Sequence, residues 1–335
     1  MKELQVSAKD AGQRLNKYIM KYLNQAPSSF VYKMLRKKNI TRNGKKAAGD
    51  EILVENDKIC LYLSDETIEK FRSAKTETAL QNNIQCNNQS KNASMIRQLQ
   101  ILYEDDDILA VHKPAGVLSQ KANKNDYSIN EEIVDYCLSS GKLTKEAFET
   151  FTPSVCNRLD RNTSGIILAG ITLQGSRMLS KALKDRSFDK YYFTIVKGTM
   201  KKPIHDVAYL KKDCDRNHSH VYRTPEEAGD CSKIETAFTP ISVHGDYSLL
   251  RVKLYTGKSH QIRAHLKSLG LFMLGDGKYG DETVNRMLRN RFHIKHQLLH
   301  AGMVRFPDRT VIKDPLPDYF LEIAKELKLT ITDIM

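Results

Sequence analysis

The segment RLDRNTSG, residues 158–165, places one carboxylate between two cations. Asp160 lies between Arg158 and Arg161, and an apolar run begins at Ile166 after a Thr-Ser-Gly turn. A solvent-exposed Asp–Arg pair contributes little on its own. A carboxylate at the end of a buried strand is instead held by a rigid scaffold, where functional side chains are common. Asp160 is therefore a candidate catalytic residue, which neighbouring positive charge in a dry site would keep ionised and reactive.

Two later segments could supply partners for this carboxylate. The segment KYY at 190–192 offers a tyrosine that could stack on a base or act in proton transfer, although at least one of its two tyrosines is expected to pack in a strand. The segment TGKSHQIRAH at 256–265 gathers cationic and polar side chains around a predicted helix start, where the helix dipole favours anions. These side chains are Lys258, His260, Gln261, Arg263 and His265.

The elements around these segments predict an α+β domain over residues 99–328. Strands are expected on both sides of the acidic turn in ILYEDDDILAVHKPAG, and in GIILAG, FDKYYFTIVKG, IETAFTPISVHG and YSLLRVKLYTG. Helices are expected in SRMLSKALKDR and in SHQIRAHLKSLG, the latter from Ser259 as N-cap to Gly270 as stop. Runs of adjacent strands favour a largely antiparallel mixed sheet. No Gly-rich phosphate loop is present, so no nucleotide cofactor is expected.

Residues 1–64 predict a small, separate α/β unit with a basic face. Two amphipathic helices, in QRLNKYIMKYL and APSSFVYKMLRKKN, precede an Asn43-Gly44 hairpin turn. Residues 1–60 contain 13 basic and 6 acidic side chains, which gives 13 − 6 = +7. This is about half of the net charge of +13 of the whole chain. A basic helix face suits an RNA backbone, whose phosphates Lys and Arg neutralise. The candidate RNA contacts are Lys33, Arg36, Lys37, Lys38, Arg42 and Lys45.

Composition narrows the class of protein further. Residues 65–98 are rich in Asn, Gln and Ser, and predict a polar flexible linker. No apolar stretch approaches the roughly 20 residues that span a bilayer, and the N-terminus lacks a signal-peptide core, so a cytoplasmic protein without a membrane partner is expected. The six cysteines are scattered, which indicates reduced thiols rather than disulfides or a zinc site.

Six ordered blocks carry a family resemblance over roughly residues 100–320. They are HKPAG, RLDRNTSGIILAG, KYYFTIVKG, YTGKSHQIRAHLKSLG, LGDGKYG and LLHAGMVRFP. Together they resemble the RluA-type pseudouridine synthases. The N-terminal unit resembles the RNA-binding domain of the ribosomal protein S-four type, through RLNKYI, SSFVYKMLRKKNI, RNGKK and the closing Asn-Asp-Lys at 56–58.

This resemblance implies isomerisation of uridine to pseudouridine in RNA, most plausibly large-subunit ribosomal RNA, without cofactor or metal. It implies that Asp160 is the nucleophile, which attacks either the anomeric carbon or carbon 6 of the base. Arg263 would pair with Asp160, and Tyr192 would stack on the base and help to remove the proton at carbon 5. Arg158 would take the place of the base that is flipped out of the RNA. Lys258, His260 and Gln261 would bind substrate.

The chain departs from the family at two of these positions. Many relatives have His before the Arg-Leu-Asp block, where this chain has Asn157, and many have Arg where it has Lys258. Because Lys lacks the planar fork of Arg, a phosphate contact at 258 would be less directional. The histidines at 293, 296 and 300 would share one helical face if HIKHQLLH were helical, and His218 and His220 form a second pair, but neither group has the acidic or Cys ligands of a zinc site.

Other functions fit the sequence less well. A non-catalytic rRNA-binding or ribosome-assembly protein would not need Asp160, the tyrosine and Arg263 together. A glycosidase would need a second carboxylate partner, and an aspartyl phosphatase a second Asp close behind the first; LDRNTSG has neither. A tRNA pseudouridine synthase stays an alternative, and a monomer is favoured.

Overall fold

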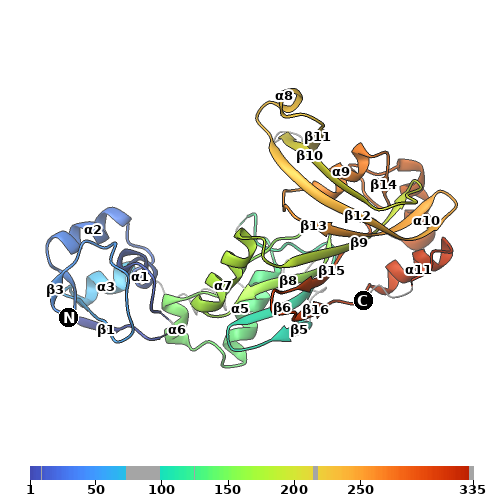
Figure 1. Ribbon diagram of the computed structural model, residues 1–335. Coiled ribbons are helices and arrows are strands. Elements are labelled where there is room, and N and C mark those ends of the chain that lie inside the picture. Colours follow the sequence, from blue (N-terminus) through green and yellow to red (C-terminus); the bar gives the residue numbers. More distant parts are fainter. Residues whose placement is uncertain (9, 73–98, 124, 214–217, 332–335) are drawn as a thin grey trace.

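The computed structural model describes residues 1–8, 10–72, 99–123, 125–213 and 218–331. The described chain forms a small N-terminal unit and a large unit built on one extended sheet (Figure 1). Most of the predicted linker lies outside the described residues. Its first residues do not: α3, at Asp65–Phe71, buries Ile68 in the N-terminal core. The prediction that the linker begins at residue 65 is therefore wrong, because one apolar side chain anchors a further helix.

The N-terminal unit packs three helices on a four-stranded antiparallel sheet. Its helices are α1 (Leu15–Tyr22), α2 (Ser28–Arg36) and α3. Its strands run in the order β1 (Lys2–Gln5), β4 (Lys58–Leu61), β2 (Ile40–Arg42) and β3 (Lys45–Lys46). The expected hairpin turn joins β2 to β3, with positive φ at both Asn43 and Gly44. The apolar faces predicted for the two helices form the core of this unit.

The large unit is the predicted α+β domain. Its strands are β5 (Ile101–Glu104), β6 (Ile108–Lys113), β7 (Ser154–Val155), β8 (Ser164–Gly170), β9 (Asp189–Lys197), β10 (Ile204–Asp213), β11 (His218–Tyr222), β12 (Ser232–His244), β13 (Tyr247–Leu254), β14 (Phe272–Met273), β15 (Leu299–Arg305) and β16 (Val311–Lys313). The main order is β11-β10-β12-β13-β9-β15-β8-β6-β5. Among these described pairs only β15 and β8 run parallel. The sheet is therefore mixed and largely antiparallel, as the sequence predicted.

Helices cover both faces of this sheet. They are α5 (Ile129–Ser139), α6 (Lys145–Thr150), α7 (Leu173–Lys184), α8 (Pro225–Ala228), α9 (Gln261–Ser268), α10 (Glu282–Phe292) and α11 (Asp318–Glu326). Apolar residues of α5 and α9 share one core with Tyr192 of β9. Those of α10 and α11 share another with Phe193, the next residue of the same strand. Because successive strand residues point to opposite faces, α9 and Tyr192 lie on the same side of the sheet.

One local prediction was wrong. The N-cap position of α9 is occupied by His260 in the left-handed conformation, with φ 58°, and not by Ser259. The segment HIKHQLLH is not one helix: His293 caps the end of α10, and His300 lies in β15. Gly270, with φ 74°, does follow the last turn of α9, where the left-handed conformation favours glycine. The helical spacing of the three histidines is therefore broken by the turn that ends α10.

Candidate active site

Asp160 lies in the loop between β7 and β8, and the residue before it is fixed by a hydroxyl group. Ser119 Oγ accepts a hydrogen bond from the backbone N–H of Leu159 and donates one to its carbonyl oxygen, both at 3.0 Å. The Leu159 side chain is itself buried in the core. The Asp160 carbonyl accepts the N–H of Thr163, which closes the turn that leads into β8. The carboxylate is therefore carried on a backbone with little freedom to move.

Asn157 anchors the same loop to β8. Its side-chain nitrogen donates to the carbonyl of Ile166 at 3.1 Å, and its oxygen accepts from the N–H of Leu168 at 2.7 Å. The amide thus pairs with β8 as a strand backbone would. At the start of β8, Gly165 has φ 121°, and a Cβ added there would lie 2.4 Å from the Ala301 carbonyl oxygen. Only glycine lets β8 approach β15 this closely beside the Asp160 loop.

A buried lysine connects the HKPAG segment to the same loop. The side chain of Lys113 is fully buried, and its ammonium donates to the carbonyls of Pro114, Val117 and Arg161 at 2.9, 2.9 and 3.1 Å. Burial lowers the pKa of Lys113 to about 7, while the charge of Asp160 acts in the opposite direction. Three hydrogen bonds use the whole donor capacity of the ammonium. Lys113 therefore holds the loop that carries Asp160.

Arg263, on α9, is the direct partner of Asp160. Its Nη1 donates to Asp160 Oδ2 at 2.9 Å. Its Nε and Nη2 donate to the two carboxylate oxygens of Asp276, at 2.6 and 2.8 Å. Burial opposes charge at both Arg263 and Asp276, yet their mutual hydrogen bonds and attraction raise the pKa of the arginine and lower that of the aspartate. Arg263 is thus held in a bidentate pair with Asp276, and its third nitrogen, Nη1, binds Asp160.

Asp276 has a fully buried side chain with further partners. Its Oδ1 also accepts the backbone N–H groups of Lys278 and Tyr279. Tyr279 is fully buried too, and its ring lies 5.1 Å from the Arg263 guanidinium carbon. The segment LGDGKYG therefore supplies both the anion and the aromatic face that fix the arginine. The sequence of this segment and of HKPAG does not by itself indicate the roles of Asp276, Tyr279 and Lys113. Both segments belong to the six blocks that carry the family resemblance, and this is the signal that could have identified the three residues.

Gln261 holds the loop that starts α9, and its side chain bonds within the protein, so that its binding of substrate stays a prediction. Its oxygen accepts from Thr256 Oγ1 and from the Lys258 N–H, at 2.9 and 3.0 Å. Its nitrogen donates to the Glu235 carbonyl and to Thr236 Oγ1, at 3.2 and 3.0 Å. These four bonds use all the capacity of the amide. Gln261 is therefore a structural residue of the cavity wall.

His260 lies close to the carboxylate and is held by Tyr279. Its Nδ1 lies 3.0 Å from the Tyr279 hydroxyl, and its Nε2 lies 4.0 Å from Asp160 Oδ2. Burial lowers the pKa of His260, although the charge of Asp160 acts to raise it. The imidazole is therefore mostly neutral near pH 7. Lys258, two residues earlier, is exposed at the rim of the cavity.

Asp160, Tyr192 and Arg263 line one cavity of about 790 Å³. Tyr192 is buried, and burial raises its pKa, with the negative charge of Asp160 acting in the same direction. The tyrosine is therefore a neutral phenol in this cavity. The Asp160 side chain is 26% exposed, and among the described residues no donor is bonded to its Oδ1. One carboxylate oxygen is thus oriented by Arg263, and the other is available to a ligand.

The two arginines that flank Asp160 in the sequence are not its partners. Arg158 and Arg161 are both exposed, and Arg161 Nε donates to the Gly116 carbonyl at 3.0 Å. Asp160 is therefore not held by the two charges that flank it in the sequence; Arg263 makes its ion pair, as the family resemblance implied. Arg158 lies on the cavity wall among further cations, while Asp160 is the only carboxylate among the described residues of that wall. These cations are Lys121, Arg158, Lys184, Arg186, Lys190 and Lys258.

This arrangement suits covalent or electrostatic catalysis on an anionic ligand. A carboxylate with one oxygen free can attack an electrophilic carbon, and the cationic wall attracts phosphates. In the described parts of the chain, no three His, Cys, Asp or Glu side chains gather as metal ligands would. No helix there is long and apolar enough to cross a membrane. The described cysteines, Cys60, Cys137, Cys156 and Cys231, are free thiols; Cys86 and Cys214 lie outside the described residues.

Curated proteins similar to this chain include ribosomal large subunit pseudouridine synthase C of Rickettsia bellii, which is 27% identical over 92% of this chain and 95% of its own length. The enzyme of the same name from Escherichia coli is 28% identical over 91% and 88%. An uncharacterized RNA pseudouridine synthase of Mycoplasma genitalium is 29% identical over 93% and 91%. Because each similarity covers more than nine-tenths of this chain, each includes at least part of the N-terminal unit.

The fold has a counterpart among solved structures. The human RNA pseudouridylate synthase domain containing 4 protein aligns with 76% of this chain and 99% of its own, with a TM-score of 0.58 and 18% identity. Residues 107–268, which carry Asp160, Tyr192 and Arg263, match the family described as RNA pseudouridylate synthase. Residues 107–268 thus form an RNA pseudouridylate synthase domain, and the enzyme is an RNA pseudouridine synthase.

Proposed function

We propose that this protein isomerises specific uridines of large-subunit ribosomal RNA to pseudouridine, with Asp160 as nucleophile, and that it acts in the cytoplasm. The observation that carries the proposal is the carboxylate of Asp160 in the cavity, with Oδ2 paired to Arg263 and Oδ1 unbonded. The ribosomal substrate is supported by the names of relatives that align with most of this chain.

The reaction needs no added group. The bond between N1 of uracil and the anomeric carbon breaks, the base turns, and carbon 5 bonds to the anomeric carbon. Carbon 5 then loses its proton, and N1 gains one, so that atoms and electrons balance. Asp160 would form a transient covalent bond, either to the anomeric carbon or to carbon 6 of the base. The geometry described above fits both routes, because each needs one free carboxylate oxygen.

Arg263 and Tyr192 would act around that step. Arg263 would bind one oxygen of the Asp160 carboxylate and fix the direction of the free one, because Asp276 holds the Nε and Nη2 of the arginine. Tyr192 is buried in the same cavity, where its neutral ring can stack on the uracil. The raised pKa of Tyr192 favours this stacking role. If Tyr192 also receives the carbon 5 proton, that transfer must be coupled to loss of its own hydroxyl proton.

The uridine must leave the RNA stack to reach this cavity. Flipping a base costs a few kcal/mol, and contacts at the cavity rim can offset this cost. Arg158 is exposed at the rim, where its planar group could fill the space that the base leaves. Lys258 and His260 are placed to contact the same nucleotide.

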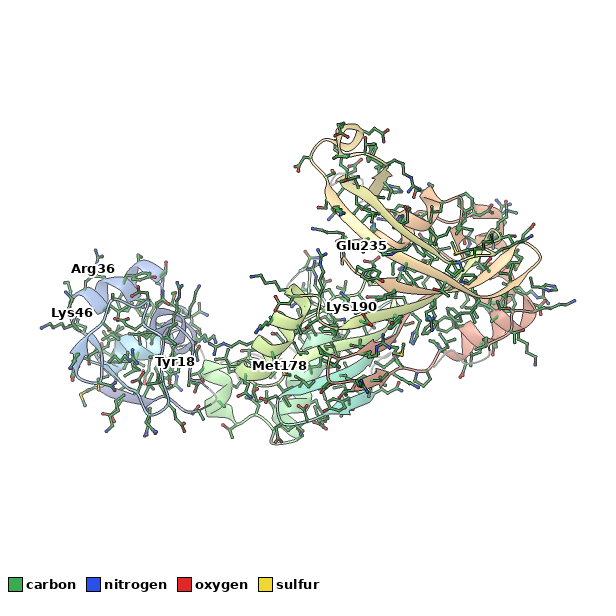
Figure 2. The ribbon with its side chains drawn as sticks, viewed as in Figure 1. Tyr18, Arg36, Lys46, Met178, Lys190 and Glu235 are labelled. Carbon is green, nitrogen blue, oxygen red and sulfur yellow. The ribbon has the colours of Figure 1, made fainter. Side chains whose placement is uncertain are left out.

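The N-terminal unit would bind RNA outside the cavity, as a domain of the ribosomal protein S-four type. Lys33, Arg36, Lys37, Lys38 and Lys45 are all exposed, and Figure 2 labels Arg36 and Lys46 on the same side of this unit. Arg42 differs, because it pairs with the buried carboxylate of Asp57 at 2.6 Å. We therefore expect it to contribute less to RNA binding. A second attached site raises affinity without new contacts in the cavity.

The test uses RNA with tritium at carbon 5 of uridine, since isomerisation must release it. A large-subunit rRNA transcript is incubated with the wild type and with Asp160→Asn. Release by the wild type alone would support both the reaction and the nucleophile, and mapping the product would identify the uridine. Release from tRNA but not from rRNA would favour the tRNA alternative. Salt-sensitive binding without release from total cellular RNA would favour a non-catalytic RNA-binding protein.

A further inference from the structure

Lys190 is a half-buried cation of the cavity that has no hydrogen-bonded or ion-paired partner among the described residues. It begins β9, two residues before Tyr192, and lines the same cavity. Among the described residues, none forms a hydrogen bond or an ion pair with its ammonium. The centre of the Phe188 ring lies 5.9 Å from the Lys190 Nζ. Nearby strand lysines differ in this respect. Lys253 pairs with Asp189, and Lys197 pairs with Asp281, each at 2.7 Å.

The surroundings of Lys190 favour an incoming anion. Burial lowers its pKa, and the positive charge of Arg186 acts in the same direction. A partly desolvated cation without a counter-ion is unfavourable, and this cost is relieved when an anion enters. The carboxylate of Asp160 is already paired with Arg263. An anionic group of the ligand is therefore the natural partner of Lys190.

The position of Lys190 indicates which part of the ligand it meets. Residues i and i+2 of a strand point to the same face and lie about 7 Å apart. Lys190 is thus one step along the cavity wall from Tyr192, at the labelled position in Figure 2. Lys190 is also less buried than Tyr192. A base stacked on Tyr192 would place the backbone of its own nucleotide toward the lysine.

Gly257 leaves this space open. A Cβ added at Gly257 would lie 4.0 Å from Lys190 Nζ, in van der Waals contact. The backbone of Gly257 is not in the left-handed region, so its conformation does not demand glycine. A longer side chain at this position would cover the ammonium. The absence of a side chain therefore keeps Lys190 accessible from the cavity.

We propose that Lys190 binds the phosphodiester of the uridine that enters the cavity and so positions the flipped nucleotide against Tyr192. This inference rests on the proposed function, because it assigns a contact to the same substrate. Lys190 is a positioning residue and not part of the chemical step. Its removal should weaken substrate binding more than it slows the chemistry.

The experiment measures tritium release from the large-subunit rRNA transcript at increasing NaCl. It compares the wild type with Lys190→Met, Lys190→Arg and the control Lys197→Met. The control also removes one lysine of β9, at the opposite end of the strand and outside the cavity. We expect Lys190→Met to raise KM about tenfold with little change in kcat, as for loss of a charged hydrogen bond. The slope of log(kcat/KM) against log[NaCl] should become less negative by about 0.7 to 0.9.

Two features separate a phosphate contact from other roles. Lys190→Arg should restore the salt slope because it keeps the charge, and Lys197→Met should match the wild type. An unchanged slope with a lowered kcat would overturn the inference and assign the lysine to the base or to proton transfer. An equal loss of slope in Lys197→Met would overturn it as well, as an effect of overall charge. A wild type that releases no tritium would instead refute the proposed function, and the inference with it.

Discussion

Replacement of Asp276 by Asn tests whether the bidentate pair with Asp276 holds Arg263 in the orientation that catalysis needs. Asp276 accepts both parallel donors of Arg263 and two backbone N–H groups. Asn has the same size as Asp. Both carboxylate oxygens of Asp276 accept from N–H groups, so the NH₂ group of Asn would face a donor in either orientation. Removing one partner of a buried pair costs about 3–5 kcal/mol. Because Asp160 still balances the arginine, we expect the lower end, about 3 kcal/mol of unfolding free energy.

The same variant should also lose catalytic activity. Without Asp276, the guanidinium can turn to bind both oxygens of Asp160 and occupy the free one. A misplacement of about 1 Å at a reacting group lowers the rate by about 100-fold, so we expect a kcat loss of that order with KM little changed. The assays are tritium release and urea unfolding.

The control for this variant is Asp281→Asn. Asp281 caps α10 through the Val284 N–H and pairs with Lys197 at 2.7 Å. Asn caps a helix as well as Asp, and a solvent-exposed ion pair contributes at most about 1 kcal/mol, so the control should stay near the wild type. If Asp276→Asn lost less than about 1 kcal/mol, the value of a neutral hydrogen bond, and kept its kcat, the reasoning about Arg263 would be refuted.

Two further predictions follow from the buried charges. Lys113→Met should lower the unfolding free energy by about 3 kcal/mol, because three buried carbonyls lose their donor; a urea midpoint within error of the wild type would contradict this. Burial lowers the pKa of several histidines below 6.5, so the unfolded chain binds more protons in mild acid, and stability should fall as the pH drops below about 6.5. Urea unfolding across that range should show the fall, and constant stability would argue against it. The histidines are His218, His260, His265, His296 and His300.

The elements that carry the site were predictable because each is specified locally. The apolar run after Asp160 is β8, and the apolar spacing between Gln261 and Gly270 is α9. Alternation of apolar and polar residues also identified β9, β12 and β13. The unexpected helix α3 follows a polar stretch with one buried side chain, Ile68, too few apolar residues for a periodic signal.

The partners of the site residues were less predictable, because they come from distant segments. Arg161 follows Asp160 directly, yet its side chain is exposed and binds the Gly116 carbonyl. The carboxylate pairs with Arg263, 103 residues later in the chain, a partner that the family resemblance implied but that the local sequence does not indicate. Gln261 is polar and lies at a helix start, and the resemblance implies that it binds substrate. Only the fold shows that Thr236, Thr256 and two backbone groups use its amide completely.

The charges of this site divide into a balanced interior and an unbalanced rim. In the interior, the carboxylates of Asp160 and Asp276 meet the cations of Arg263 and Lys113, so the buried groups nearly cancel before any ligand enters. At the rim, six Lys and Arg side chains line the cavity. Apart from Asp160, its described lining residues include no carboxylate that could balance them. Within this site, electrostatic attraction of RNA must therefore come from the rim and depend strongly on salt. The reactivity of Asp160 depends on the interior geometry, so that Lys190→Met and Asp276→Asn should alter different kinetic constants.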